Sequence, residues 1–242
     1  MHQKTEGIVL HSLKYGDNGL IVKIFTRDLG LKSFMVKGFR SRKSSLKASL
    51  FIPLTIITMD IDGRKTAAAF NSIKEAQCLS PMHQIQSNFS KQATALFIAE
   101  VLYKTIADEA AHEDLYEFIE STLKYLNDTP SLPSLFPHFF LVRYSRYLGL
   151  YPNENADSEL YFDMRDGVFT SIRNLHSDFF MEAESNALKT LLNSDATQIG
   201  ELKWSNSLRA SLLQGLLNYY RIHLLNFREI RSHVVLSEVL RG

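Results

Sequence analysis

The hydrophobic pattern of this chain changes its period at Ser80 and Pro81, and this change constrains the fold more than any other feature. Before it, apolar and polar residues alternate over short runs, as in β-strands. After it, apolar residues recur every three or four positions, as on one face of an α-helix. The 242 residues are therefore expected to form two parts, residues 1–80 and residues 81–242.

The first part reads as a small all-β domain. Turn residues separate five expected strands, at residues 6–12, 19–26, 31–37, 50–61 and 65–75. In the second of these, Leu20, Val22 and Ile24 fall on one face, and Asp62-Gly63 is a strong hairpin signal between the last two. Five short strands in about 80 residues indicate a closed barrel. The OB-fold is the commonest such barrel that binds oligonucleotides, and composition alone does not separate it from an SH3-like barrel.

The second part reads as mainly helical. A helix at 89–106 is apolar almost all round, as in a buried central helix, and a one-faced helix covers 115–126. A third helix spans 134–148 and ends at Gly149. Asp178 is expected to cap a fourth helix to residue 192, and Ser205 or Ser207 to begin a fifth through residue 225. The fold class is thus α+β and multidomain: a five-stranded OB-fold barrel, then an all-α domain with a hairpin or loop insertion at 151–175.

Charge is distributed unevenly along the chain. Residues 1–80 carry 13 Lys and Arg against 6 acids, a net +7, whereas the whole chain carries +1, which leaves −6 for the rest. Such asymmetry indicates a basic module for nucleic acid or another polyanion beside a neutral-to-acidic one. A mildly basic small β-domain without such a ligand is the alternative.

The positive charge is concentrated between Leu29 and Met59, a segment without acids, and mostly inside KGFRSRKSSLK. Lys and Arg side chains displace counterions from phosphates, and exposed aromatic rings stack on bases. Phe34 could stack in this way, but the alternation also suits a place in the barrel core. The DNA-binding candidates are Lys32, Lys37, Arg40, Arg42, Lys43, Lys47, Phe39 and Tyr15.

Several classes of protein are not expected. The single cysteine, Cys78, forms no internal disulfide or cysteine-based zinc site, which suits a reducing cytoplasm. No apolar run reaches the length of a membrane span. No nucleophile elbow, phosphate loop or HExxH motif is present. His112-Glu113-Asp114 and His176-Ser177-Asp178 read as helix starts with acids in the first turn, so no catalytic residue is expected and the protein is not expected to be an enzyme.

The third helix carries cations among aromatic residues. His138, Arg143 and Arg146 could dock an acidic, hydrophobic peptide or a terminal carboxylate. An ordinary amphipathic helix with a solvated edge explains the same residues, and on the residues alone this second interpretation is favoured.

The stretches EGIVLHSLKYGDNGLIVKIFTRDLG and FMVKGFRSRKSSLKASLFIP resemble the N-terminal domain of the RecO family, bacterial recombination mediators and DNA repair proteins. HFFLVRYSRYLGLYP and FREIRSHVVLSEVL are weaker matches to later parts of the same family. Together the matches span the chain.

The resemblance implies an OB-fold joined to a helical domain that binds single- and double-stranded DNA without a nucleotide cofactor. Family members anneal strands coated by single-strand-binding protein, dock the acidic C-terminal tail of that protein, and work with RecR to help load RecA in the RecFOR pathway, independently of SOS. The implied setting is the bacterial cytoplasm, in association with the nucleoid and without a membrane partner. Carried over by motif, the DNA contacts are Lys37, Arg40, Arg42, Lys43 and Lys47.

Two alternatives to this mediator function stay open. A barrel fold does not by itself identify its ligand. The first alternative is therefore an OB-fold module that binds RNA or a ribosomal or tRNA partner. An enzyme whose site is assembled from loops is the second.

One departure from the family concerns zinc. Many relatives carry a four-cysteine zinc motif after the Leu-Gly-Tyr helix, and residues 151–175 contain no cysteine. We therefore expect no zinc and no other cofactor. The insertion is expected to hold its shape by packing of Tyr161, Phe162, Val168 and Phe169 on the helices.

Overall fold

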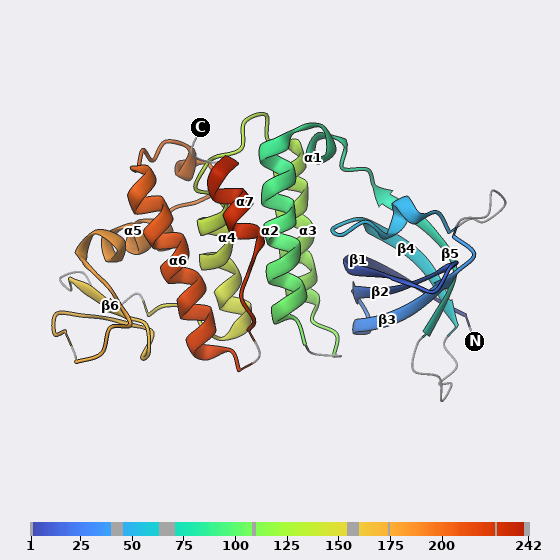
Figure 1. Ribbon diagram of the computed structural model, residues 1–242, viewed down its shortest axis with the longest axis horizontal. Helices are drawn as coiled ribbons and strands as arrows, with labels where there is room; N and C mark the ends of the chain where they lie inside the picture. The colour runs from blue at the N-terminus through green and yellow to red at the C-terminus, as the bar shows by residue number, and fades with distance from the viewer. Residues whose placement is uncertain are drawn as a thin grey trace. The chain divides into compact units, whose positions relative to one another are not determined.

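The computed structural model of the chain describes residues 2–39, 46–62, 71–107, 110–153, 160–173, 175–225 and 227–239. They belong to two compact units, Met1–Thr129 and Pro130–Gly242. The first unit holds a β-barrel and the helices that follow it, and the second holds further helices and a small sheet (Figure 1). The boundary expected at residue 80 falls inside the first unit, between barrel and helices, and stays a prediction.

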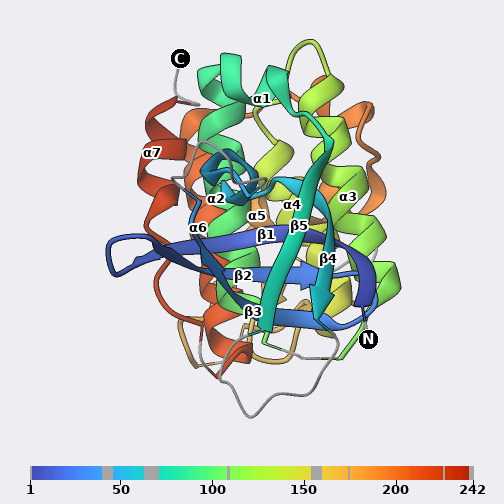
Figure 2. The same cartoon turned by 90° about the vertical axis from the view of Figure 1, so that its right-hand side faces the viewer.

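Within the described residues, five strands close the barrel in the order β1-β2-β3-β5-β4, and β4 pairs back with β1 (Figure 2). All pairs are antiparallel except β3 with β5. This closure confirms the expected OB-like barrel. The strands are His2–Tyr15 (β1), Gly19–Thr26 (β2), Gly30–Lys37 (β3), Ile56–Asp62 (β4) and Asn71–Ser80 (β5).

The expected strand at 19–26 is confirmed, but two later boundaries are wrong. Ala48–Phe51 form a 3₁₀ helix (η1), because Phe51 packs into the barrel core, and the chain turns at Leu54 with a φ of 68° before β4 begins. The last strand ends later than expected, since Ser80 still pairs with Ile56 of β4, and its expected start at residue 65 lies outside the described residues. The predicted Asp62-Gly63 turn lies outside the described residues from Gly63 on.

The barrel core confirms the alternation found in the sequence. Leu20, Val22 and Ile24 point inward, and Phe34, from β3, is fully buried among them. Phe34 is therefore a core residue rather than a surface for bases.

Three helices complete the first unit: His83–Ser87 (α1), Phe89–Thr105 (α2) and Glu113–Asp128 (α3). Most of α2 is buried, as its apolar composition predicts. The interpretation of His112 as a helix start is confirmed, because its Nδ1 accepts a hydrogen bond from the Leu115 amide at 3.2 Å and Glu113 and Asp114 occupy the first turn.

The second unit contains Phe136–Tyr144 (α4), Glu182–Asn193 (α5), Asn206–His223 (α6) and Ser232–Val239 (α7). The expected helix at 134–148 is present, with a last turn of 3₁₀ type (η2, Ser145–Leu148) that ends at Gly149 in the left-handed region. Ser205, not Ser207, caps α6 by accepting from the Leu208 amide.

The insertion forms a small sheet of Tyr161–Asp163 (β6), Val168–Thr170 (β7) and Phe179–Phe180 (β8). Its hairpin at Asp166-Gly167 was expected, and Gly167 has the φ of 68° that such a turn requires. The prediction that residues 176–178 begin a helix is wrong. Phe179–Phe180 pair with β6 instead, so α5 starts only at Glu182.

None of the described helices is long and apolar enough to cross a membrane.

Candidate nucleic-acid interface

Tyr15 and Lys37 lie together at one end of the barrel. Both pair with Gly19 on the central strand, so all three face outward in one row. Tyr15 is 58% exposed and Lys37 is exposed. Gly38 has a φ of 71°, and its amide donates to the Asn18 carbonyl at 3.1 Å, which ties the end of β3 to the β1–β2 turn. This end of the barrel thus offers a cation and an aromatic ring side by side.

The residues on either side of residues 40–45, which we call the basic segment, pack on the barrel. Phe39 before it packs partly buried against the barrel core, and Leu46 after it is a buried member of that core. Because its ring packs inward, Phe39 is a poorer surface for a base than Tyr15. Lys47 is exposed at the start of η1. Arg40, Arg42 and Lys43, between the two anchors, lie outside the described residues.

Lys32 does not join this group. It pairs with the buried Ile24 near the other end of β3, five residues from Lys37. At about 3.3 Å per residue, the two backbone positions are about 16 Å apart. Of the described candidates, the structure thus brings Tyr15 and Lys37 together and leaves Lys32 apart.

The outward residues of β2 show where this surface ends. The Lys23 ammonium lies 5.3 Å from the ring centre of Tyr103 on α2, and the Phe25 ring lies 6.1 Å from that of Tyr116 on α3. His11, the β1 partner of Lys23, stacks on the same Tyr103 ring at 4.3 Å. Desolvation and the nearby Lys23 charge lower the pKa of His11. Helices therefore cover the outer face from Lys23 onward, and the half toward Tyr15 is open.

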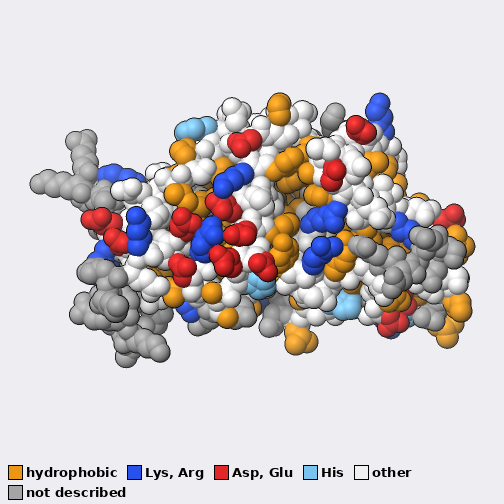
Figure 3. Space-filling view, turned by 180° about the vertical axis from the view of Figure 1, so that it is seen from behind, with side chains coloured by type: hydrophobic (Ala, Val, Ile, Leu, Met, Phe, Trp, Pro, Cys, Tyr) orange, Lys and Arg blue, Asp and Glu red, His pale blue; other side chains and the backbone are white. Residues whose placement is uncertain are grey.

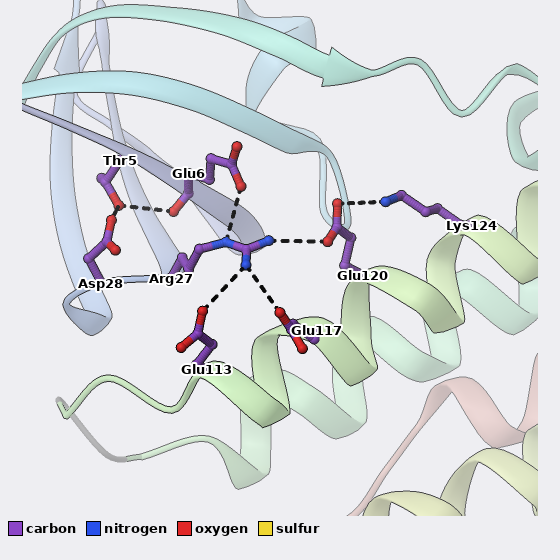
Figure 4. A network of polar contacts seen from close by, with 8 residues as sticks. All are labelled: Thr5, Glu6, Arg27, Asp28, Glu113, Glu117, Glu120 and Lys124. Carbon is purple, nitrogen blue, oxygen red and sulfur yellow. Dashed lines mark hydrogen bonds and ion pairs between the residues drawn. The ribbon is translucent and has the colours of Figure 1, made fainter.

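Arg27, in the β2–β3 turn, joins the barrel to α3 through an ion-pair network (Figure 4). Its guanidinium is 3.2 Å from Glu6 and 3.3 Å from Glu120, with Glu117 and Glu113 at 3.5 and 3.8 Å. It also lies 4.6 Å from the Tyr116 ring centre. Burial alone would lower the pKa of Arg27, but the surrounding carboxylates outweigh it and raise that pKa. Figure 3 shows Lys and Arg side chains beside Asp and Glu side chains on the face of the molecule turned away from the view of Figure 1.

In the second unit, the three candidate residues for peptide binding do not lie together. Arg143 and Arg146 both contact Tyr151: the Arg143 Nη1 is 3.3 Å from its hydroxyl, and the Arg146 guanidinium lies 4.2 Å from its ring centre. Arg143 also donates to the Ser194 carbonyl, whereas Arg146 is exposed. The two arginines therefore form one cationic and aromatic surface.

His138 lies elsewhere, buried against α6. Its Nε2 is 2.8 Å from the Arg209 carbonyl, which accepts the hydrogen bond, and its buried Nδ1 has no hydrogen-bond partner among the described residues. Desolvation lowers the pKa of His138 to about 4, so the ring is neutral at pH 7. A neutral imidazole supplies no charge to a carboxylate, although it lines a pocket that also holds the side chain of Arg209.

Side-chain packing and polar pairs hold the insertion in place. The Phe162 ring meets the Tyr219 ring edge-on at 5.5 Å, which confirms its predicted packing on the helices. The His176 Nε2 lies 3.2 Å from a carboxylate oxygen of the buried Asp163. Within the described ranges, no three His, Cys, Asp or Glu side chains are close enough to hold a metal ion. The expectation of no zinc stays a prediction.

Sequence reasoning missed the outward row of Leu13, Ile21 and Met35 and the network around Arg27. The row could have been predicted from the sequence, because residues that alternate with the inward Leu20, Val22 and Ile24 must face outward. The network was not, because nothing local to Arg27 indicates that α3 folds over it.

Comparison with known proteins covers both units. The family model "Recombination protein O N terminal" matches residues 1–82, and "Recombination protein O C terminal" matches residues 86–230. A protein of Phocaeicola vulgatus named DNA repair protein RecO is 37% identical over 240 residues, and one of Bacteroides fragilis with the same name is 38% identical over 241; each match covers 99% of both chains. A Flavobacterium psychrophilum protein of that name is 32% identical over 240 residues, again 99% of both chains. These matches, together with the OB-like barrel and the helices that follow it, show that the chain belongs to the RecO family.

Proposed function

We propose that this protein acts in DNA repair and recombination by binding single- and double-stranded DNA through its barrel. The observation that carries the proposal is the end of the barrel where Tyr15 and Lys37 are exposed together and where Phe39, two residues after Lys37 in the sequence, packs against the core. The name DNA repair protein, carried by relatives over the whole length, supports the same function.

Binding on such a surface is electrostatic first. Each Lys or Arg that neutralises a phosphate releases condensed counterions, so affinity falls as salt rises. Lys37 and Lys47 flank the segment that carries Arg40, Arg42 and Lys43, which places five cations within eleven consecutive residues. No bond is made or broken, so the protein is a binding protein rather than an enzyme.

The test is fluorescence anisotropy of a labelled single strand titrated with Lys37→Gln. We expect weaker binding, with a salt slope reduced by about 0.7 for the lost phosphate contact. Lys124→Gln is the matched control, because Lys124 is an exposed lysine of the same unit and pairs with Glu120 on α3. Equal affinity of Lys37→Gln and wild type would move the site away from this end of the barrel. Preference for an RNA oligonucleotide of the same sequence would favour an RNA-binding module instead.

The finer proposal is strand annealing. A basic surface that neutralises phosphates lowers the repulsion between two strands, and attachment to the tail of single-strand-binding protein raises the local concentration of the coated DNA. We place the acidic tail on the surface of Arg143, Tyr151 and Arg146, where cations and an aromatic ring adjoin.

Two variants distinguish between the two possible binding sites for the tail peptide in the second unit. Arg146→Ala should weaken peptide binding at least several-fold, because Arg146 is exposed and its partner is a ring rather than an acid. Arg209→Ala, in the pocket beside His138, is the matched control and should leave it unchanged. Weakening by Arg209→Ala alone would place the tail in that pocket.

RecR is the further partner, and RecA is affected indirectly. Family resemblance supports this part of the proposal. Loading of RecA on DNA coated by single-strand-binding protein should require both this protein and RecR, and should occur without ATP hydrolysis by this protein.

A further inference from the structure

Three aliphatic side chains form a strip across the open outer face of the barrel. Leu13 pairs with Ile21, and Ile21 pairs with Met35, so the three lie side by side on β1, β2 and β3 and face outward. Leu13 is 56% exposed, and the other two are half-buried. We call these three residues the aliphatic strip.

The strip lies between two rows that carry cations. On one side is the row of Tyr15, Gly19 and Lys37, and on the other is the row of His11, Lys23 and Ser33. Beyond the second row the surface is closed, because Tyr103 of α2 contacts both His11 and Lys23. Among the described residues, Tyr103 thus blocks a ligand on the strip on that side, and exposed Tyr15 and Lys37 leave the other side open.

The dimensions and chemistry of this surface suit one strand of nucleic acid. Three strands at about 4.8 Å spacing span about 10 Å, and three rows about 6.7 Å apart span about 13 Å, room for two to four nucleotides. An apolar centre with cations at both edges complements a chain with apolar bases and anionic phosphates. A duplex turns its bases inward and presents mainly phosphates, so it does not match the apolar centre.

The way in which the strip would hold bases is unusual for an OB-like barrel. Base stacking on an aromatic ring contributes enough to change affinity about 5- to 150-fold per base. Among the described residues of the three rows, Tyr15 is the single Phe, Tyr or Trp, and it lies at the corner. The centre of the surface offers aliphatic contact alone.

We propose that the bases of two to four nucleotides of a bound single strand lie on the aliphatic strip, held without aromatic stacking, so that they transfer readily to a complementary strand. This inference rests on the proposed DNA binding and adds the residues that contact bases. The strip would bind the bases weakly and without sequence preference, while the cations bind the phosphates strongly. Such a surface would bring strands together without competing with base pairing.

The test adds an aromatic ring to the strip. Leu13→Trp should raise affinity for a single strand about 5- to 150-fold and should slow annealing of that strand, because a stacked base must first leave the ring. Affinity for an abasic oligonucleotide of the same length should not rise. Leu79→Trp is the matched control, because Leu79 is an exposed leucine of β5, outside the strip. It should change neither affinity nor annealing.

The outcomes separate this inference from the proposed function. If wild-type protein binds no DNA, the proposed function fails. If wild type binds but Leu13→Trp binds both oligonucleotides as wild type does, the bases do not lie on the strip and the inference alone is overturned. An equal gain on the abasic oligonucleotide would overturn it too, since the new ring would then contact the backbone. Circular dichroism of each variant confirms that the barrel is folded.

Discussion

Replacement of Arg27 by Ala should destabilise the first unit, because one guanidinium serves four carboxylates and an aromatic ring. The side chain of Arg27 is 26% exposed and that of Glu120 is 15% exposed, so this pair is shielded from water more than the others. The contacts join β1, the β2–β3 turn and α3 (Figure 4). Loss of Arg27 leaves Glu6 and Glu120 without their shared counterion.

The magnitude follows from these contacts. A hydrogen bond to a charged group contributes about 1.5–3 kcal/mol when shielded, which suits Glu120, and the half-exposed pairs with Glu113 and Glu117 contribute about 0–0.5 kcal/mol each. The cation–π contact with Tyr116 adds about 0.5–1 kcal/mol. Solvent screening makes the Glu6 pair a small addition, so the total loss is about 2–5 kcal/mol.

The assay is thermal unfolding followed by circular dichroism. At about 2–4 °C per kcal/mol for a protein of this size, Arg27→Ala should unfold about 4–20 °C below wild type. Lys124→Ala is the control: it also removes a partner of Glu120, at 2.9 Å, but an exposed i,i+4 pair contributes only about 0.2–0.5 kcal/mol. Equal melting temperatures of Arg27→Ala and wild type, or an equal loss in the control, would refute the reasoning.

Three further predictions concern the second unit. Because burial lowers the pKa of His138 to about 4, below the value of 6.5 in the unfolded chain, the unfolded state takes up the proton first. Stability should then fall by roughly 3 kcal/mol as pH falls from 6.5 to 4, and urea titrations of His138→Gln should show a smaller fall. Gly215→Ala should destabilise by about 1–3 kcal/mol in thermal unfolding, because its new Cβ would lie 2.0 Å from Phe180 Cε1; a gain of about 1 kcal/mol, the helix preference for Ala, would show that Phe180 yields. Chelation with EDTA should leave the melting temperature unchanged, because Phe162 packing and the pair of Asp163 and His176 hold the insertion; a lower melting temperature would show a bound metal.

Alternation along the strands predicted the barrel and its core, because one residue in two must point inward. Leu20, Val22, Ile24 and Phe34 all occupy that core. Boundaries failed where tertiary contacts overrode local pattern: Phe51 enters the core from a 3₁₀ helix, and Phe179 and Phe180 join a sheet instead of a helix.

The sequence predicted which residue types form the candidate interface, but it did not predict which of them lie close together. Tyr15 and Lys37 lie together because both pair with Gly19, a fact of register that composition does not contain. Lys32 belongs to the same acid-free stretch between Leu29 and Met59, yet its place near the opposite end of β3 separates it from them. His138 was chosen for its possible charge, and burial beside α6 removes that charge.

Salt dependence of DNA binding tests the central claim most directly. The affinity of a labelled single strand should fall about 100-fold between 50 and 200 mM salt, as five phosphate contacts at about 0.7 each would require. Combined replacement of Arg40, Arg42 and Lys43 by Ala should lower affinity at every salt concentration and flatten the slope by about 2, at about 0.7 per lost contact. Binding that is equally tight, with an equal slope, in wild type and in this variant would contradict the account.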